Sequence, residues 1–454
     1  LRNMLEMQNY EELNRVLDSY QKLFLRDQTD EFKVYDAFNS FQVVIPSYEE
    51  LLIDWVNEYP DAYQPYLALA KFYYIKGWQS RGHKYVSETS HEQFEGMHFY
   101  FDLAEKNALQ AISINPDLMA AYDLLIGIYN TGGPHEKEYQ TIIKAIELFP
   151  YSYLIWSAAS WATEPRWGGS YYEMENLAKE AEKFISVNPR LVLLYGFIYY
   201  DQGRYASSDN RNEQAIELFN KARSFGDCRK FNYELAKIYY YDLKQYDMAL
   251  GHLAKCIQLR PTINEAYLIR SEIYLLEEKY GQAIENLKLA ERIDPMDTSL
   301  DQTKEWACKY LVFQGNKLFR INKQAAIDKY DLAVQFDSEY YEPYHWRAVI
   351  FYQQKDFESA LVNAKRAVEL NPRHFESYRI LDYTLAQYRD WNTIIHYWNS
   401  YMALEPNNPD AYFERSGTHY HNGHMQSALA DLKKACELGH KGACQKYKQL
   451  AGSY

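Results

Sequence analysis

The stretch NEAYLIRSEIYLLEEKYGQAIENLKLAERIDP, residues 264–295, contains two amphipathic helical segments separated by a short turn. Apolar and small residues recur three to four positions apart in each segment, which is the spacing of one buried helix face. Large residues fall where the first segment would meet the second, and small residues fall where two backbones would approach closely. These positions are Tyr267, Ser271, Tyr274, Ala283, Leu287 and Ala290. The stretch therefore predicts a helix hairpin that ends at Pro295.

Prolines repeat this hairpin at a fixed interval along the chain. Pro116 and Pro150, Pro261 and Pro295, and Pro372 and Pro406 are each 34 residues apart. A 34-residue period is typical of a helix-turn-helix repeat array. The unit that ends at Pro372 keeps the same register, with Tyr344, Ala348, Phe351, Ala360, Ala364 and Ala367. The 454 residues are therefore expected to form stacked hairpins and not several separate globular cores.

Over most of its length this pattern resembles the tetratricopeptide repeat (TPR) family. The resemblance implies an all-α fold, an α-α superhelix or TPR solenoid of about ten helix pairs. One continuous solenoid is expected, divided into an N-terminal helical cap at 1–60, units with insertions at 61–190, regular units at 191–439 and a C-terminal capping helix at 440–454. The insertions are placed at about 77–97 and 164–170. The sequence does not decide whether the array associates with a second copy of itself.

Composition narrows the classes of partner. The net charge is −13, which disfavours nucleic acid and anionic membranes because phosphate binding needs a basic stripe. The longest apolar run, residues 191–200, is about half the length of a membrane span. We therefore expect no membrane span and a cytoplasmic location. The chain begins at Leu1 and not at Met, so a periplasmic or secreted location is the alternative if a targeting segment was removed.

The N-terminal part departs from the regular period. The insertions extend the spacing from Pro60 to Pro116 by 22 residues and that from Pro150 to Pro189 by 5. Four short motifs occur in this part, in the order YEEL (10–13), YDAF (35–38), GW with RG (77–82) and PRWGGS (165–170). Over residues 1–190 this order resembles a bacterial TPR family built around a domain of unknown function. That family brings no established activity.

Three residues of the insertions form a candidate ligand site. Arg81 and Arg166 offer planar donors for a carboxylate or phosphate, and Trp167 offers a ring face for stacking. The alternative is that these residues only pack one inserted loop onto its neighbour. Ser170 is expected to cap the helix that follows the loop.

The C-terminal stretch ACELGHKGAC, residues 435–444, resembles the Sel1-like relatives of this repeat. In secreted, cysteine-rich members of that group, cysteines eight residues apart bridge one helix to the next, and Cys436 and Cys444 have this spacing. The other three cysteines are isolated, so no disulfide framework is indicated and a reduced, buried pair is the expectation, with a disulfide as the alternative. A metal site that includes His440 would lack a fourth ligand.

No catalytic motif stands out. His419, His421 and His424 form a dense cluster, but helical register places them on different faces. Nucleophile elbows, phosphate loops and dinucleotide glycine fingerprints are not found in the sequence. We therefore expect no catalytic residues, no metal, no cofactor and no enzymatic activity.

Three arginines recur at position 7 of their units. A row formed by Arg270, Arg347 and Arg415 resembles a clamp for a carboxylate tail. The family resemblance favours another role, in which each arginine pairs inside its own unit with position 23. Those partners would be Asn286, Asn363 and Asp431.

The first helices of the later units are expected to line a concave groove, as the resemblance implies for positions 2, 5, 9, 12 and 13. The groove residues are Glu234, Tyr241, Asp242, Leu268, Glu272, His345, Tyr352, Gln353, Arg379, Tyr383, Gln387, Phe413, Tyr420 and His421. Aromatic rings with acidic neighbours suit an extended peptide or partner helix that carries Lys or Arg. An ordinary solvated inner face is the alternative.

These patterns predict a non-catalytic TPR scaffold or adaptor that binds a protein or peptide partner in this groove. The alternative function is a small-ligand or effector-sensing regulatory protein whose site lies between the first insertion and the PRWGGS loop.

Overall fold

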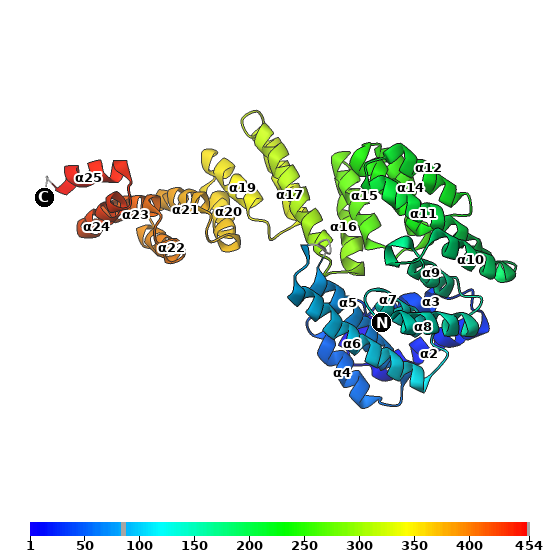
Figure 1. Cartoon of the computed structure of the whole chain (residues 1–454). Helices are drawn as coiled ribbons and strands as arrows, with labels where there is room; N and C mark the ends of the chain where they lie inside the picture. Colours follow the sequence, from blue (N-terminus) through cyan, green and yellow to red (C-terminus); the bar gives the residue numbers. More distant parts are fainter. Residues whose placement is uncertain (83–87, 452–454) are drawn as a thin grey trace. The chain divides into compact units, whose positions relative to one another are not determined.

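The computed structural model describes residues 1–82 and 88–451. Within these residues every regular element is helical, and successive helices pack as hairpins, which confirms the predicted all-α solenoid of TPR type (Figure 1). None of the described helices is both long enough and apolar enough to cross a membrane.

The contacts between residues group the chain into two compact units. Unit 1 comprises Leu1–Ile273 and Lys288–Asp297, and unit 2 comprises Tyr274–Leu287 and Thr298–Tyr454. The sequence predicts one continuous solenoid, but the boundary falls within the helix pair α15 (Asn264–Leu276) and α16 (Tyr280–Ile293). The next helix, α17 (Thr298–Leu318), has 21 residues where α15 has 13, so the helix length changes at this boundary.

Unit 1 begins with four N-terminal helices and continues with helix hairpins. Its α-helices besides α15 and α16 are α1 (Arg2–Glu6), α2 (Tyr10–Arg26), α3 (Phe32–Asn39), α4 (Tyr48–Glu58), α5 (Tyr63–Arg81), α6 (His91–Ile114), α7 (Met119–Asn130), α8 (His135–Leu148), α9 (Tyr153–Ala162), α10 (Tyr171–Ala181), α11 (Leu193–Ser208), α12 (Asn212–Arg223), α13 (Arg229–Lys237) and α14 (Tyr246–Leu259). Short 3-10 turns are η2 (Pro165–Trp167), η3 (Glu182–Phe184) and η4 (Pro189–Val192), and η5 (Ile238–Asp242) is a π-helical turn that extends α13.

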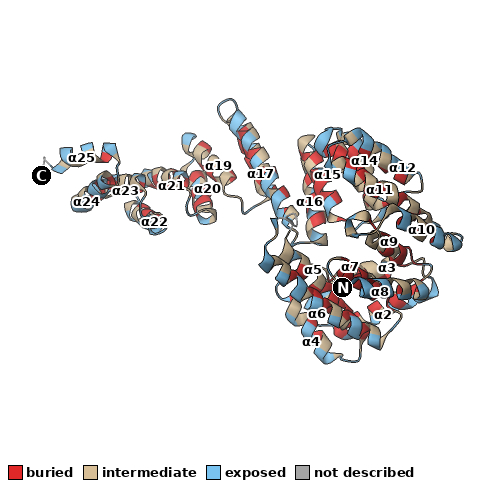
Figure 2. Ribbon diagram, viewed as in Figure 1, coloured by how far each residue is buried: buried red, intermediate tan, exposed pale blue. Residues whose placement is uncertain are grey.

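Unit 2 consists of more regular hairpins. Its further helices are α18 (Lys323–Phe336), α19 (Glu342–Gln353), α20 (Phe357–Leu370), α21 (Phe375–Gln387), α22 (Trp391–Leu404), α23 (Pro409–His421), α24 (Met425–Glu437) and α25 (Lys441–Ala451). The small residues of the predicted register are buried, as at Ala360, Ala364 and Ala367, so the helix-packing positions are confirmed. In both units the buried residues lie on the sides of the helices that face their neighbours (Figure 2).

Several hairpins are held together by an aromatic ring on a glycine. A side-chain carbon added at Gly77 of α5 would lie 2.7 Å from the ring of Phe101 in α6. The same separation is found between Gly203 of α11 and Phe219 of α12. Because real carbon atoms do not approach so closely, both positions need glycine for the two helices to pack at this distance.

The first insertion is shorter than the sequence predicts. Helix α5 continues through Gly77 to Arg81 and ends at Gly82, whose φ of +73° favours glycine. Helix α6 begins at His91, because Ser90 and Gln93 form a capping box there. Both helices therefore extend into the stretch that is expected as a loop at about 77–97. Residues 83–87 of that stretch lie outside the described residues.

The N-terminal helices lie along the first helices of the hairpins that follow. Helix α2 packs against α5, and α3 packs against α5 and α7. The segment also reaches much later parts of unit 1, since Arg260 donates to Asp36 at 2.8 Å. Residues 1–60 therefore cover an inner face of unit 1 in addition to its end.

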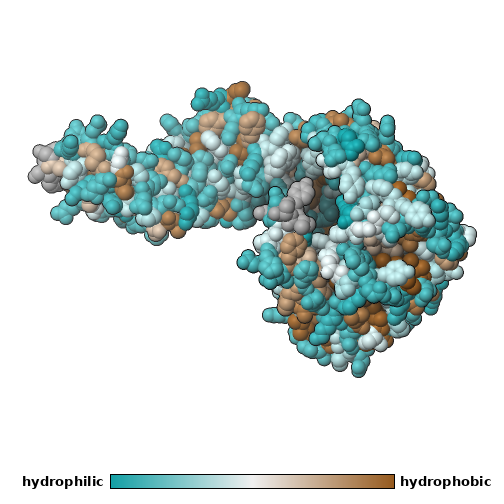
Figure 3. All heavy atoms as spheres, in the orientation of Figure 1, coloured by the Kyte–Doolittle hydropathy of each residue, from teal (hydrophilic) through white to brown (hydrophobic). Residues whose placement is uncertain are grey.

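Hydrophobic residues appear on the visible surface as scattered patches among hydrophilic ones (Figure 3).

Candidate functional site

The predicted groove residues fall into two groups. Glu234, Tyr241, Asp242, Leu268 and Glu272 belong to unit 1, and the other nine belong to unit 2. Leu268 is buried, whereas Tyr241 is half exposed. We describe the two groups separately.

Unit 2 contains a groove of about 730 Å³ between α17, α19 and α21. This C-terminal groove is lined by Asn316, Tyr341, Glu342, His345, Trp346, Val349, Tyr352, Gln353, His374, Glu376, Arg379, Ile380 and Tyr383. Five of these are predicted groove residues: His345, Tyr352, Gln353, Arg379 and Tyr383. The structure thus brings these five side chains together.

One wall of the C-terminal groove is a network around Arg379. Its guanidinium donates to Glu376 and to Glu414, both at 3.0 Å, and to the hydroxyl oxygen of Tyr383 at 2.7 Å. The ring of Tyr383 lies 6.4 Å from that of Tyr352. Because two carboxylates already engage Arg379, the groove does not present this arginine as an unpaired anion receptor, and it holds two aromatic faces in place.

The other end of the C-terminal groove contains two neutral histidines. The pKa of His345 is lowered to about 4 by burial and by the neighbouring His374, and burial also lowers the pKa of His374. Ser377 bridges the two rings, at 2.8 Å from His374 Nδ1 and 3.3 Å from His345 Nδ1. Ser377 is fully buried, so this chain of hydrogen bonds supports the packing of α19 against α21. With the histidines neutral, Glu342 and Glu376 outnumber Arg379 among the charged residues that line the groove.

The remaining four predicted residues of unit 2 are not among the lining residues of this groove, although Gln387 lies next to it. Gln387 extends the wall, since its amide approaches the Tyr352 hydroxyl at 3.5 Å. Phe413 is stacked against His440 at 4.3 Å between ring centroids, and His421 is stacked against Trp391 at 5.5 Å. Tyr420 is nearly half exposed.

Several lining residues are absent from the prediction. Trp346 and Val349 follow His345 on α19 and are partly buried, and Tyr341 and His374 precede α19 and α21. The helical spacing of residues 342, 345, 346, 349 and 353 was a usable signal, because residues three and four apart share one helix face. Repeat positions 2, 5, 9, 12 and 13 describe only part of the helix face that lines the groove.

The predicted loop site is occupied by internal contacts. Arg166 pairs with Glu164 at 2.8 Å and with Asp201 at 2.5 Å, and Trp167 packs edge-on against Trp161. Arg81 lies over the rings of Trp78 and Phe94. These contacts agree with the alternative in which Arg81, Arg166 and Trp167 pack the inserted loops and do not bind a ligand.

The start of α10 confirms one local prediction. Ser170 caps this helix by accepting from the backbone N–H of Glu173.

The arginines at position 7 behave differently from one another. Arg415 makes the expected pair with Asp431, through two contacts of 2.7 and 2.5 Å. Arg347 instead pairs with Asp331 of the preceding unit at 3.1 Å, while Asn363 donates to the carbonyl of Ser359. The internal pairing is thus confirmed in the last unit and wrong for Arg347.

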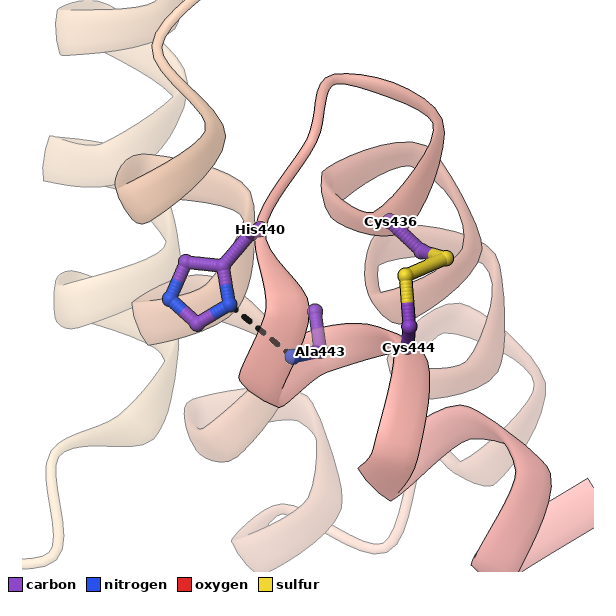
Figure 4. The surroundings of a disulfide bond; sticks show 4 residues. All are labelled: Cys436, His440, Ala443 and Cys444. Atoms are coloured by element: carbon purple, nitrogen blue, oxygen red, sulfur yellow. Dashed lines mark hydrogen bonds between the residues drawn. A yellow bond between two sulfur atoms is a disulfide. The ribbon is translucent and has the colours of Figure 1, made fainter.

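The structure joins Cys436 and Cys444 in a disulfide (Figure 4). Their Cα atoms are 4.6 Å apart, because the turn between α24 and α25 brings the two helices together. The expectation of a reduced, buried pair is therefore wrong in both respects, since each cysteine is also partly exposed. His440 lies in the turn between α24 and α25 with its ring directed away from the sulfur atoms, and its Nδ1 accepts from the N–H of Ala443 at 2.9 Å (Figure 4).

The histidine cluster of the sequence is divided in space. His419 faces Asp431 at 3.8 Å, whereas His421 stacks on Trp391. Among residues 1–82 and 88–451, no group of three or more His, Cys, Asp or Glu side chains is arranged to hold a metal ion.

The hairpin architecture and the groove between first helices define an α-solenoid of TPR type. Residues 341–374 match the model described as "Tetratricopeptide repeat", and residues 1–135 match "Domain of unknown function (DUF4034)". The chain therefore contains a tetratricopeptide repeat at residues 341–374 and a DUF4034 segment at residues 1–135. The second match ends before the PRWGGS loop, although the resemblance was expected to extend to residue 190.

Solved structures with a detectable likeness are short TPR proteins. A MamA protein is 19% identical and covers 40% of this chain and 93% of its own, with a TM-score of 0.27. YrrB, described as a TPR protein with an unusual peptide-binding site, is 17% identical over 51% of this chain and 99% of its own, with a TM-score of 0.25. PilW, described as a type IV pilus biogenesis factor, is 20% identical over 45% and 91%, with a TM-score of 0.24. No curated protein matches the sequence.

Proposed function

We propose that this protein is a non-catalytic scaffold that binds a protein or peptide partner in the C-terminal groove. The observation that carries the proposal is the convergence of Tyr352, Tyr383 and Trp346 from α19 and α21 on one groove of about 730 Å³. Aromatic side chains on rigid helices supply contact area at low entropic cost, which is the usual composition of a binding hot spot. A groove of this kind accepts an extended segment or one face of a helix.

The charges of the groove favour a basic partner. Glu342 and Glu376 line it, and Arg379 is held by carboxylates on either side. An incoming Lys or Arg would meet Glu342 and the faces of the tyrosines, where ion pairing and cation-π contact act together. We therefore expect a segment that combines Lys or Arg with apolar residues.

A displayed peptide library selected against the full chain tests this function. We expect enriched peptides to contain basic and apolar residues. Tyr352→Ala and Tyr383→Ala should each weaken their binding by about tenfold or more, since hot-spot truncations cost about 2 kcal/mol. Tyr388→Ala is the matched control, because Tyr388 follows α21 and is 53% exposed. Equal binding by all three variants would exclude the C-terminal groove as the binding surface.

A further inference from the structure

Unit 1 contains a second hollow, which we call the N-terminal cavity. It has a volume of about 610 Å³ and lies between α3, α5, α7 and α9 and the residues at the start of α13 and the end of α14. The lining residues come from segments between positions 30 and 261. Helix α3 contributes Tyr35 and Asp36, so the docked N-terminal segment forms one wall.

The wall at α3 is fixed by two ion pairs around Tyr35. Lys71 lies 3.6 Å from Asp123, and Arg260 lies 2.8 Å from Asp36. The ammonium of Lys71 and the guanidinium of Arg260 are 5.0 and 5.4 Å from the Tyr35 ring. Each of these two cations is matched by a carboxylate, so this wall adds no net charge to the cavity.

Three further cations, Arg190, Arg229 and Lys230, line the cavity without an ion pair to a carboxylate. Arg190 donates to the backbone carbonyl of Thr29 at 3.0 Å. Arg229 and Lys230 open α13, and neither side chain has an ion pair or hydrogen bond with another residue of the described chain. The ammonium of Lys230 lies 5.2 Å from the ring of Phe197, and burial lowers the pKa of this lysine. The carboxylates of Glu164 and Asp123 attract Lys230, but neither forms an ion pair with it. Burying a cation without a direct ion pair is costly, and an anion bound beside it would lower that cost.

The other acidic residues of the lining do not offset these charges. Asp30 is engaged by Lys33 at 2.6 Å. Asp227 is engaged by Arg223 and Lys255, each at 3.2 Å. The cavity therefore keeps an excess of positive charge although the whole chain carries −13.

The remaining walls suit a flat apolar group. Tyr74, Tyr153 and Trp161 line the cavity, and the Ser157 side chain adds a hydroxyl. Aromatic walls with a few placed polar groups, at a volume between about 300 and 1,000 Å³, are typical of small-molecule sites.

We propose that the N-terminal cavity binds a small aromatic anion, with Arg229 and Lys230 taking its carboxylate or phosphate and the tyrosine and tryptophan rings taking its ring. This site is independent of the C-terminal groove. It also differs from the site expected at Arg81, Arg166 and Trp167, none of which lines the cavity. A ligand here would contact both α3 and α13 and would strengthen the attachment of the N-terminal segment.

Calorimetric titration of the full chain tests the site. The probes are phenyl phosphate and benzoate as the two anion types, and benzyl alcohol as the uncharged analogue. We expect at least one anion to bind and benzyl alcohol not to bind measurably. Lys230→Met should weaken the anion by about tenfold or more, because a charge-assisted contact is lost. Lys237→Met is the matched control, since Lys237 lies on the same helix, pairs with Glu234 at 2.8 Å and does not line the cavity.

A second variant keeps the test decisive if Lys230→Met misfolds. Arg229→Gln should weaken the same anion, and circular dichroism shows whether each variant retains its helices. The bound anion should also slow alkylation of Cys228 by iodoacetamide, because Cys228 lines the cavity. Failure of both anions to bind, equal binding of benzyl alcohol, or unchanged affinity in a folded Lys230→Met or Arg229→Gln variant would overturn the proposal.

Discussion

The two units differ in what lies against their first helices. In unit 1, α2 and α3 of the same chain cover α5 and α7, and Asp36 reaches Arg260. In unit 2, α17, α19 and α21 line a groove whose walls carry Tyr352 and Tyr383. The difference shows that helix hairpins of one type can form two kinds of site. A covering segment encloses charged residues, whereas an uncovered groove leaves aromatic rings accessible.

The largest expected effect tests whether the units are separate. Trp55 of unit 1 and Trp398 of unit 2 are both almost completely buried. Replacing either by Ala should cost about 3–5 kcal/mol, the range for large aromatic residues in cores. In calorimetry we expect Trp55→Ala to lower only the transition of unit 1 and Trp398→Ala only that of unit 2. A shift of both transitions by either variant would show that the units unfold together.

The attachment of the N-terminal segment should depend on pH. Glu31 is fully buried, accepts from the Ser152 hydroxyl and from the N–H of Leu154, and leaves its Oε1 without a partner. Burial raises its pKa to about 7, against the hydrogen bonds and the positive charge of Arg190, which lower it. A raised carboxyl pKa means that the folded state holds the proton more tightly than the unfolded state. This contribution to stability is present below pH 4.5 and is lost as the pH rises through about 7.

The loss amounts to about 3 kcal/mol, at 1.36 kcal/mol for each pKa unit. We expect the unfolding free energy of unit 1 to fall by up to this amount between pH 4.5 and about 7. Glu31→Gln should remove most of that dependence, because the amide cannot ionise. Chemical denaturation at several pH values measures both. An unchanged pH dependence in Glu31→Gln would show that other groups cause it.

A smaller effect is expected at the end of unit 2. Replacing Cys436 by Ser removes a bridge that closes a short loop, which is worth on the order of 2 kcal/mol. Because the bridge joins only α24 and α25, the loss should be confined to the last helix. Hydrogen exchange should show faster exchange in α25 and unchanged exchange in α19 and α21. Equal exchange in the reduced and oxidised wild type would mean that the disulfide adds no stability.

The smallest expected changes in stability come from replacing Arg379 of unit 2 and Lys230 of unit 1. Arg379 has partners in the C-terminal groove, so Arg379→Met should destabilise unit 2 by about 0.5–1 kcal/mol. Lys230 has no ion-pair partner among the described residues, so Lys230→Met should stabilise unit 1 by about 1 kcal/mol in the absence of a ligand. Denaturant titrations measure the change in unfolding free energy for each variant. Changes of opposite sign would support the conclusion that Arg379 has ion-pair partners and Lys230 has none.

The repeating elements could be predicted from the sequence because their signals are local. Ala360 and Ala364 mark a helix contact within one hairpin, and the 34-residue period repeats that contact. The same local register explains why His345, Tyr352 and Tyr383 were placed together. Repeat positions describe neighbours within the array, so they also identify one wall of the C-terminal groove.

Contacts between distant segments could not be predicted in this way. Asp36 and Arg260 are 224 residues apart, and no spacing rule relates an N-terminal helix to the loop after α14. The N-terminal cavity depends on such contacts, so Arg229 and Lys230 were not recognised as lining residues. The spacing of Cys436 and Cys444 is compatible with a disulfide. The three other cysteines are isolated in the sequence, which favours reduced cysteines, so the sequence did not decide between the two states.

The pair between Asp36 and Arg260 also affects how the protein is made. Regular repeat arrays fold by adding each hairpin to its neighbour as it emerges. Here α3 can complete its contacts only after another 224 residues have been synthesised, which takes roughly 10 to 45 s at about 5–20 residues per second. During that interval α2 and α3 can already pack on α5 and α7, but Asp36 lacks its ion pair with Arg260. Ribosome-bound chains that end before residue 260 should therefore hold α3 less firmly than the finished chain does.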